Sequence, residues 1–180
     1  MHRNGLLLLL KAHQPYDAHE KMMHQRIIDF IEANPLCFER TLTIGHITAS
    51  ALIVNKQRTH TLMTHHHKLE KWLQLGGHSD GDPNPLSVAL REAEEESGLK
   101  EITPVTENIF DVDVHPIPAR KNEPEHFHYD VRFLFEADDS HILTITAESK
   151  NLAWIPLGDI KQYTTEESIL RMVRKLQTPK

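Results

Sequence analysis

Cysteine is almost missing from this chain of 180 residues, in which Cys37 is the single thiol. One thiol excludes an internal disulfide and fits a reducing cytosol, and we expect Cys37 to be buried and inert. Long hydrophobic runs are missing too, because Leu6 to Leu10 is too short to span a bilayer and lacks a signal-peptide cleavage site after it. We therefore predict a cytoplasmic protein with no membrane partner, in which Leu6 to Ala12 is a helix end that packs on the domain.

An excess of basic charge is also lacking, since the formal net charge is −6. This balance argues against general nucleic-acid binding. With 39% hydrophobic and 26% charged residues, the chain can form one substantial core, so a single domain suffices. We expect residues 1–40 to be a helical extension packed on a domain formed by residues 41–180.

Three residues mark the ends of a helix near the middle of the chain. Asn84 can cap its first turn, Pro85 has the fixed φ that suits the first helical position, and Gly98 fits just past the end. The pattern predicts a helix over Pro85 to Ser97. An apolar stripe would hold it against a core, and consists of Leu86, Val88, Ala89, Leu90 and Ala93.

Carboxylates cluster on one face of this helix. Glu92, Glu95 and Glu96 stand at i, i+3 and i+4, within reach of one ion. A divalent cation would offset their repulsion, and hard oxygen ligands suit Mg²⁺ or Mn²⁺ better than zinc. Acidic runs are often only solvated helix faces, and we keep that interpretation for Glu94.

The residues Gly77, Arg91-Glu92-Ala93, Glu95-Glu96 and Gly98-Leu99 resemble the Nudix box, G-x5-E-x7-R-E-U-x-E-E-x-G-U, where U is apolar. The spacing matches over 23 positions, with one departure: Pro83 stands where the box has its first Glu. The resemblance implies a hydrolase that cleaves the diphosphate bond of a nucleoside diphosphate linked to another group X, by attack of water on phosphorus. It also implies a mixed sheet between helices.

Within this resemblance, Glu92, Glu95 and Glu96 are the metal ligands and Arg91 orients them by charge-assisted hydrogen bonds. Arg91 could instead, or in addition, pair with Glu95 within the helix.

Pro83 removes a carboxylate that usually supports the ligands from the loop. Asp80 or Asp82 could replace it, which is a hypothesis.

A glycine-rich loop precedes the helix over Pro85 to Ser97. The substrate contacts expected from this glycine loop are Gly76, Gly77 and His78. Arg120 and Lys121, in a proline-rich loop, could reach phosphates or group X, or could be solvated charges. The catalytic general base does not follow from spacing. Glu148 is our first candidate because it precedes the Trp154 strand, as such a residue often does in relatives; Glu125 and Asp130 are the alternatives.

The chain is rich in histidine, with 14 residues. His126 and His128 alternate on one predicted strand face and Asp130 follows at the next matching position, so a zinc site is sterically conceivable. We favour substrate contacts or packing on the strand surface instead, with His78 slightly preferred for substrate because it lies in the glycine loop.

The remaining pattern is that of an α+β protein. A helix is predicted over Ala18 to Ala33, a turn at Asn55 to Arg58, and a final helix near Glu166 to Leu176. Strands are predicted at Ile44 to Asn55, Thr59 to His66, Ile102 to Val114, Glu125 to Ala137 and Ile142 to Ile145, with Trp154 on another short strand. Without repeated βαβ units, these elements predict a mixed sheet sandwiched between helices, α/β/α.

Two other functions stay open. A Nudix-like nucleotide-binding or regulatory module could tolerate the loss at Pro83, although the other box carboxylates are present. An isoprenoid diphosphate isomerase would want a cysteine in its site, and Cys37 lies before the first core strand, which makes that interpretation weak. The sequence leaves the nucleotide and group X unidentified, and a homodimer is compatible with it only by analogy.

Overall fold

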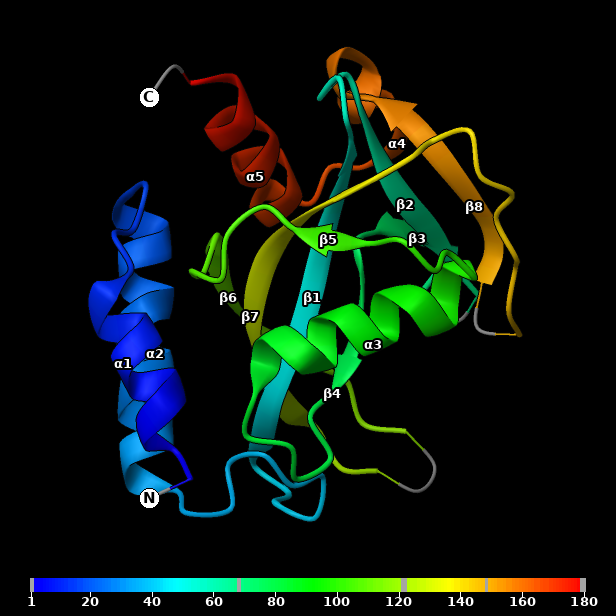
Figure 1. Ribbon diagram of the computed structural model, residues 1–180. Helices are drawn as coiled ribbons and strands as arrows, with labels where there is room; N and C mark the ends of the chain where they lie inside the picture. Colours follow the sequence, from blue (N-terminus) through cyan, green and yellow to red (C-terminus); the bar gives the residue numbers. More distant parts are fainter. Residues whose placement is uncertain (1, 68, 121–122, 148, 179–180) are drawn as a thin grey trace.

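The computed structural model describes residues 2–67, 69–120, 123–147 and 149–178. Its helices, shown in Figure 1, are α1 (Asn4–Ala12), α2 (Ala18–Ala33), α3 (Pro85–Ser97), α4 (Ile160–Tyr163) and α5 (Glu167–Gln177), with a 3₁₀ turn at Leu157–Asp159. Its strands are β1 (Gly45–Asn55), β2 (His60–His66), β3 (Lys71–Leu73), β4 (Leu75–His78), β5 (Thr103–Pro104), β6 (Asp111–Ile117), β7 (His126–Ala137) and β8 (Ser149–Pro156). Within these described residues, no helix combines the length and the apolar character needed to cross a bilayer.

Strand β1 is the centre of a mixed sheet. It runs parallel to β7 along its whole length, from the pair Gly45 and Phe127 to the pair Asn55 and Ala137. Along its other edge, β1 pairs antiparallel first with β4 and then with β2. The strand order is β3-β2-β1-β7-β5, while β6 pairs with β7 and β8 pairs with β2. Covered on both faces, every residue of β1 is buried.

Side chains alternate across β1 and divide the core into two clusters. On one face, Ala49 and Ala51 pack in the cluster that includes the buried side of α3 and the inner faces of α1 and α2. On the other face, Leu52 and Val54 pack with Met172 and its neighbours on α5. Figure 1 shows α3 lying across β1 and β4, with α1 and α2 side by side next to β6 and β7. The predicted α+β arrangement, a sheet between helices, is confirmed.

The N-terminal helices follow the sequence pattern closely. Helix α2 has the predicted bounds, because the Asp17 carboxylate caps it by accepting a hydrogen bond from the Glu20 N–H. In α1, Leu6 and Leu10 are fully buried, as expected for a helix that packs on the domain. Cys37 is buried as well, and burial raises the pKa of its thiol to about 11.

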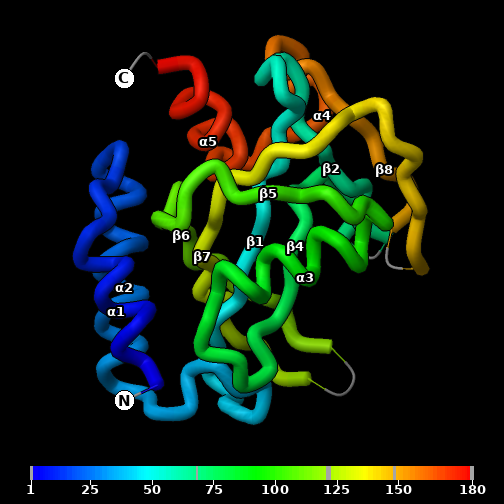
Figure 2. The backbone as a smooth tube through the Cα atoms, viewed as in Figure 1, coloured from blue at the N-terminus to red at the C-terminus, as the bar shows by residue number. Residues whose placement is uncertain are grey.

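Two strand predictions were wrong. Residues 142–145 form no strand: Ile142 is 90% exposed, and the Thr144 N–H donates to the Ser97 carbonyl at the end of α3. Figure 2 shows this stretch, in yellow, as an irregular path toward β8. The predicted strand Ile102 to Val114 is instead the two strands β5 and β6. Pro104 cannot donate to a ladder, and after the Val105 N–H, which donates to the Leu134 carbonyl of β7, the pairing is interrupted until Phe110.

Candidate active site

Helix α3 presents the predicted carboxylates from a fixed position. The Asn84 side chain accepts a hydrogen bond from the Ser87 N–H at 3.3 Å, and Gly98 ends the helix in the left-handed conformation with φ of 74°. Val88 and Ala89 are fully buried against the sheet. The caps and the buried face therefore hold α3 in place against the sheet, and its acidic edge has a fixed position.

Two glycines of β4 lie next to two of the carboxylates. A Cβ at Gly77 would lie 2.3 Å from Oε2 of Glu92, so a side chain there would displace the Glu92 carboxylate from its position. The Gly76 N–H donates a hydrogen bond to Oε2 of Glu96 at 3.2 Å. Glycine at position 77 thus leaves room for the Glu92 carboxylate beside β4.

Arg91 connects the loop after β4 to the helix. Its Nη2 atom donates to the His78 carbonyl oxygen at 3.2 Å and lies 3.1 Å from Oε1 of Glu92. The guanidinium group thus contacts the carboxylate next to it in sequence, which fits the orienting role that the Nudix resemblance implies for Arg91.

The three carboxylates form an all-oxygen donor set of the kind that Mg²⁺ and Mn²⁺ prefer. Glu92 and Glu96 are half-buried and Glu95 is exposed. Magnesium usually takes one or two protein carboxylates and completes its shell with phosphate oxygens and waters. The residues therefore fit the divalent metal that the family implies.

The aspartates near Pro83 have local partners. Asp80 forms an ion pair with Arg40, and Asp82 accepts a hydrogen bond from the Asn84 N–H at 2.9 Å. Pro83 itself is exposed. Both aspartates therefore serve the loop at the start of α3, and the hypothesis that either one replaces the missing box carboxylate stays a hypothesis.

Arg40 is a site residue that sequence reasoning missed. The hydrogen bond to Asp80 raises the pKa of its guanidinium, and the charges of Glu92 and Glu123 raise it further, against the opposing effect of burial. The Glu92 contribution places Arg40 in the electrostatic surroundings of one α3 carboxylate. No motif spacing identifies it, because it reaches the loop from the segment before β1.

The other predicted site residues that the structure describes lie in the loop before β7 and on β7. Arg120 is exposed in the loop before β7, where its N–H and carbonyl pair with Glu123, and Glu125 is exposed as well. Asp130 is buried, accepting from Ser50 at 2.8 Å, and is thus engaged inside the sheet. Glu148, the first candidate for the general base, lies outside the described residues, as does Lys121.

His78 lies on the opposite face of the sheet from the carboxylates. In the register of β4 on β1, Gly77 is opposite Ala49 and His78 is opposite Thr48, so their side chains leave opposite faces. Gly77 faces Glu92, and His78 therefore points away from α3. There its ring meets the rings of other histidines, with centroids 5.0 Å from His46 and 4.9 Å from His128.

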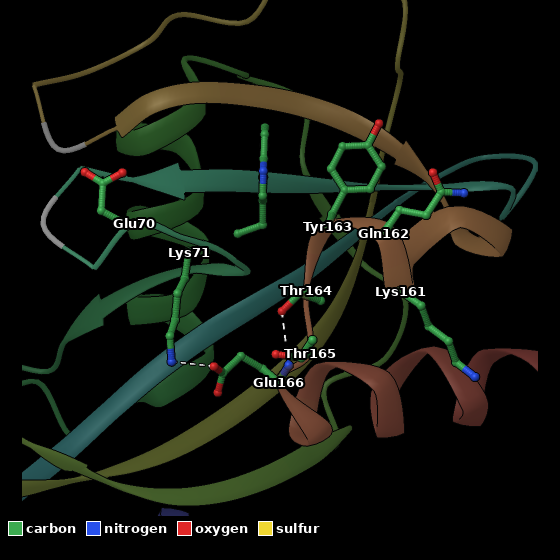
Figure 3. Close-up of a pocket in the computed structure, with 9 residues that line it drawn as sticks. Glu70, Lys71, Lys161, Gln162, Tyr163, Thr164, Thr165 and Glu166 are labelled. Atoms are coloured by element: carbon green, nitrogen blue, oxygen red, sulfur yellow. Dashed lines mark hydrogen bonds and ion pairs between the residues drawn. The ribbon is translucent and has the colours of Figure 1, made fainter.

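A pocket of about 230 Å³ lies between β3 and the segment from α4 to α5 (Figure 3). Trp72 lines it and meets Tyr163 edge-on, with ring centroids 5.7 Å apart. Lys71 and Glu166 form an ion pair, at 2.5 Å, within the same lining. None of these residues belongs to the loop and helix that carry the predicted metal ligands.

Known proteins share sequence and fold with this chain. A probable DHNTP pyrophosphohydrolase of Lactococcus lactis is 33% identical over 97 residues, 52% of this chain, and the match spans only 55% of that protein. Among solved structures, a C. elegans Ap4A hydrolase shares the fold with a TM-score of 0.59 at 18% identity, covering 73% of this chain and 94% of that one. The E. coli dihydroneopterin triphosphate pyrophosphohydrolase has a TM-score of 0.56 at 12% identity, covering 72% and 92%. The family model described as NUDIX domain matches residues 45–176, and the chain therefore belongs to the Nudix family.

Proposed function

We propose that this protein is a Mg²⁺- or Mn²⁺-dependent pyrophosphohydrolase that cleaves the diphosphate bond of a nucleotide-like substrate by attack of water on phosphorus. The observation that carries the proposal is the seating of Glu92 and Glu96 against Gly77 and Gly76, with Arg91 joined to both loop and helix. Family membership and a relative named as a pyrophosphohydrolase support the same reaction class.

Each residue of this arrangement has a role that follows from its position. Glu92, Glu95 and Glu96 would hold the cation, which when bound would neutralise charge on the diphosphate and favour attack by water. Arg91 orients Glu92 and fixes the loop through the His78 carbonyl. Arg40 supplies positive charge beside the carboxylates and is a candidate phosphate contact, together with the predicted contact Arg120. Glu148 remains our predicted general base.

The name of the Lactococcus lactis relative suggests which substrate to test first. DHNTP, the compound in that relative's name, is our first substrate to test, although the relative is matched over only about half of its length. ADP-ribose, nucleotide sugars, dinucleoside polyphosphates, NADH and nucleoside triphosphates complete the panel, because all contain the diphosphate bond that the proposed reaction breaks.

The test is release of phosphate or pyrophosphate from this panel with Mg²⁺, with Mn²⁺, and with a chelator. We expect metal-dependent cleavage, reduced at least about tenfold in Glu95→Gln and in Glu96→Gln, because each loses a metal ligand. Glu94→Gln is the matched control, since it changes the same helix without removing a proposed ligand, and it should retain activity. Full activity in both ligand variants would overturn the assignment.

Pro83 supports a second candidate, a Nudix-like module that binds nucleotides without turnover. The observation in its favour is that an exposed proline occupies the place of a supporting carboxylate. Metal and nucleotide binding with no cleavage across the panel would favour this alternative. The isomerase reading is not favoured, because Cys37 is buried and the raised pKa of its thiol keeps it protonated at neutral pH.

A further inference from the structure

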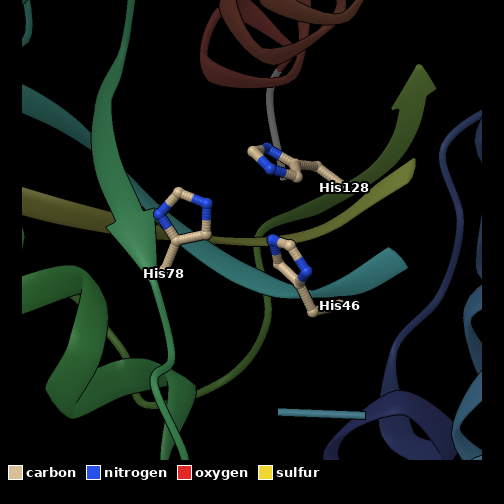
Figure 4. Close-up of side chains that lie close together, drawn as sticks. All are labelled: His46, His78 and His128. Carbon is tan, nitrogen blue, oxygen red and sulfur yellow. The ribbon is translucent and has the colours of Figure 1, made fainter. Parts of the chain in front are cut away.

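Histidines from three neighbouring strands converge on the face of the sheet that is turned away from the α3 carboxylates. His46 lies on β1, His78 on β4 and His128 on β7, and one ring nitrogen from each lies within 4.8 Å of the others. Figure 4 shows the three rings directed toward a common centre. The sheet register produces this grouping, because His46 is paired with His128 and His78 is opposite Thr48, two residues further along β1.

His46 is the least accessible member of this group. It is 4% exposed, and in the described part of the chain neither of its ring nitrogens makes a hydrogen bond. A buried polar group without a partner is costly, and most proteins avoid it unless a ligand or another function requires it. Because the polar atoms of His46 lie in the cluster that the other rings share, they indicate a site for a ligand that accepts nitrogen donors.

His126 lies beside this group, with its ring centroid 5.0 Å from that of His46 and 5.2 Å from that of His128. Its Nδ1 lies 2.9 Å from the Pro124 carbonyl, which can only accept, so the Nδ1 atom carries the proton. The lone pair is then on Nε2, which lies 3.3 Å from Nε2 of His128. A backbone carbonyl that fixes the tautomer in this way is the usual outer support of a metal-binding histidine.

We propose that His46, His78 and His128 bind a divalent transition-metal ion of the zinc class, with His126 as candidate fourth ligand. Tetrahedral zinc with Zn–N distances of 2.0–2.1 Å places its nitrogens about 3.3 Å apart, so the three rings need to approach one another by about 1.5 Å at most. The ion would join β1, β4 and β7 near the loop that follows β4. The site is distinct from the α3 carboxylates in donor atoms and in sheet face, and it does not depend on the proposed hydrolysis.

The test uses the full chain, stripped of metal and titrated with Co²⁺ and with Zn²⁺ in the presence of excess Mg²⁺. We expect one tightly bound ion per chain, visible with Co²⁺ as the d–d absorption of nitrogen ligation. His78→Asn and His128→Asn should each weaken binding at least about tenfold, because each removes one ligand. His115→Asn is the matched control, since its ring lies 5.5 Å from that of His128 but outside the ligand group, and it should bind as the wild type does.

Glu96→Gln separates this site from the proposed catalytic one, and it should leave the Co²⁺ spectrum unchanged while reducing any hydrolysis. Circular dichroism and urea unfolding confirm that each variant is folded, and His78, half-buried on a short strand, is the variant of choice if a substitution at His128 disturbs the sheet. Unchanged Co²⁺ binding in folded His78→Asn, or no binding by the wild type beyond what Glu96→Gln abolishes, would overturn the proposal.

Discussion

Two buried polar regions lie next to each other on one face of β1 and β7, and they handle burial in opposite ways. In the first, Arg132 is 2% exposed and lies 2.7 Å from Asp130, 3.4 Å from Asp111 and 3.4 Å from Asp113. In the second, four residues before Arg132 on β7, the His128 ring faces the rings of other histidines. We call the first region the charge network and the second the histidine cluster, formed by His46, His78, His126 and His128.

Distant elements complete the charge network. From α5, Arg171 contacts Asp111 at 2.7 Å, and Lys175 contacts both Asp111 at 2.7 Å and Glu20 of α2 at 2.6 Å. The network therefore joins the N-terminal and C-terminal helices to the sheet. Each of these charges has an opposite charge beside it, as buried ions require.

We interpret the difference between the two regions as a difference in role: structural for the charge network and ligand-binding for the histidine cluster. Protein groups alone satisfy the charge network, so it needs nothing from outside and is best explained as a structural element. Among the described residues, neither ring nitrogen of His46 has a hydrogen-bond partner, in keeping with the ligand site that we propose there. Substitutions in each region test this difference.

The largest effect is expected from breaking the charge network. Arg132→Met leaves Asp130 and Asp113 buried without their closest cation, and we expect the free energy of unfolding to fall by about 3–5 kcal/mol. Urea unfolding measures this change. Lys56→Met, which removes an exposed pair with Asp138, is the control and should change stability by less than about 1 kcal/mol. A loss at Arg132 as small as that of the control would show that the network contributes little.

Acid should break the same network at Glu20. Burial acts to raise the pKa of this carboxyl, but hydrogen bonds from His13, Lys175 and the Tyr16 N–H outweigh it and lower the pKa from 4.5 to about 2. The unfolded chain therefore binds a proton more readily than the folded one, so this stabilisation is present above pH 4.5 and is lost as the pH falls toward 2. Its size is about 3 kcal/mol.

Unfolding of the wild type and of Glu20→Gln between pH 6 and pH 2 checks the sign and the size. The Gln variant is less stable at pH 6 and should lose much less of its stability over the range in which Glu20 titrates. Parallel curves for the two proteins would contradict the assignment of this pH dependence to Glu20.

The histidine cluster should respond in the opposite direction. His46→Leu removes two buried nitrogens that lack hydrogen bonds, so the metal-free protein should be as stable as the wild type or more stable by about 1 kcal/mol. Zn²⁺ at 100 times its dissociation constant should stabilise the wild type by about 2.7 kcal/mol and the variant by much less. Thermal unfolding with and without Zn²⁺ measures both effects. A variant that is destabilised without metal would show that His46 is structural.

These regions also show how far the sequence alone could go. Local signals sufficed for α3, because Asn84, Pro85 and Gly98 act on neighbouring backbone, and for the Nudix box, whose residues share one helix and its loop. The zinc set considered from the sequence was His126, His128 and Asp130, but Asp130 is engaged by Arg132 and Ser50.

The histidines that do converge come from separate strands. Their grouping depends on the parallel register of β1 on β7 and on the placement of β4, which no local pattern specifies. The false strand at residues 142–145 has the same origin, since its alternation is local but a strand also needs a partner. Arg40 was missed for the same reason, because only the folded chain brings it to Asp80.

The smallest effect on stability is expected from Arg40→Met. This substitution also tests whether Arg40 acts together with the acidic edge of α3. The pair of Arg40 with Asp80 is exposed, with 56% and 44% of the two side chains accessible, so its loss should cost less than about 1 kcal/mol. If Arg40 contacts substrate phosphates, kcat/KM should nevertheless fall several-fold while the midpoint of urea unfolding stays in place. Arg40→Lys, which keeps the charge but loses the planar fork, should fall between the wild type and Arg40→Met. Equal kcat/KM in all three proteins would restrict Arg40 to the loop at the start of α3 and leave the phosphates to Arg120 and the bound metal.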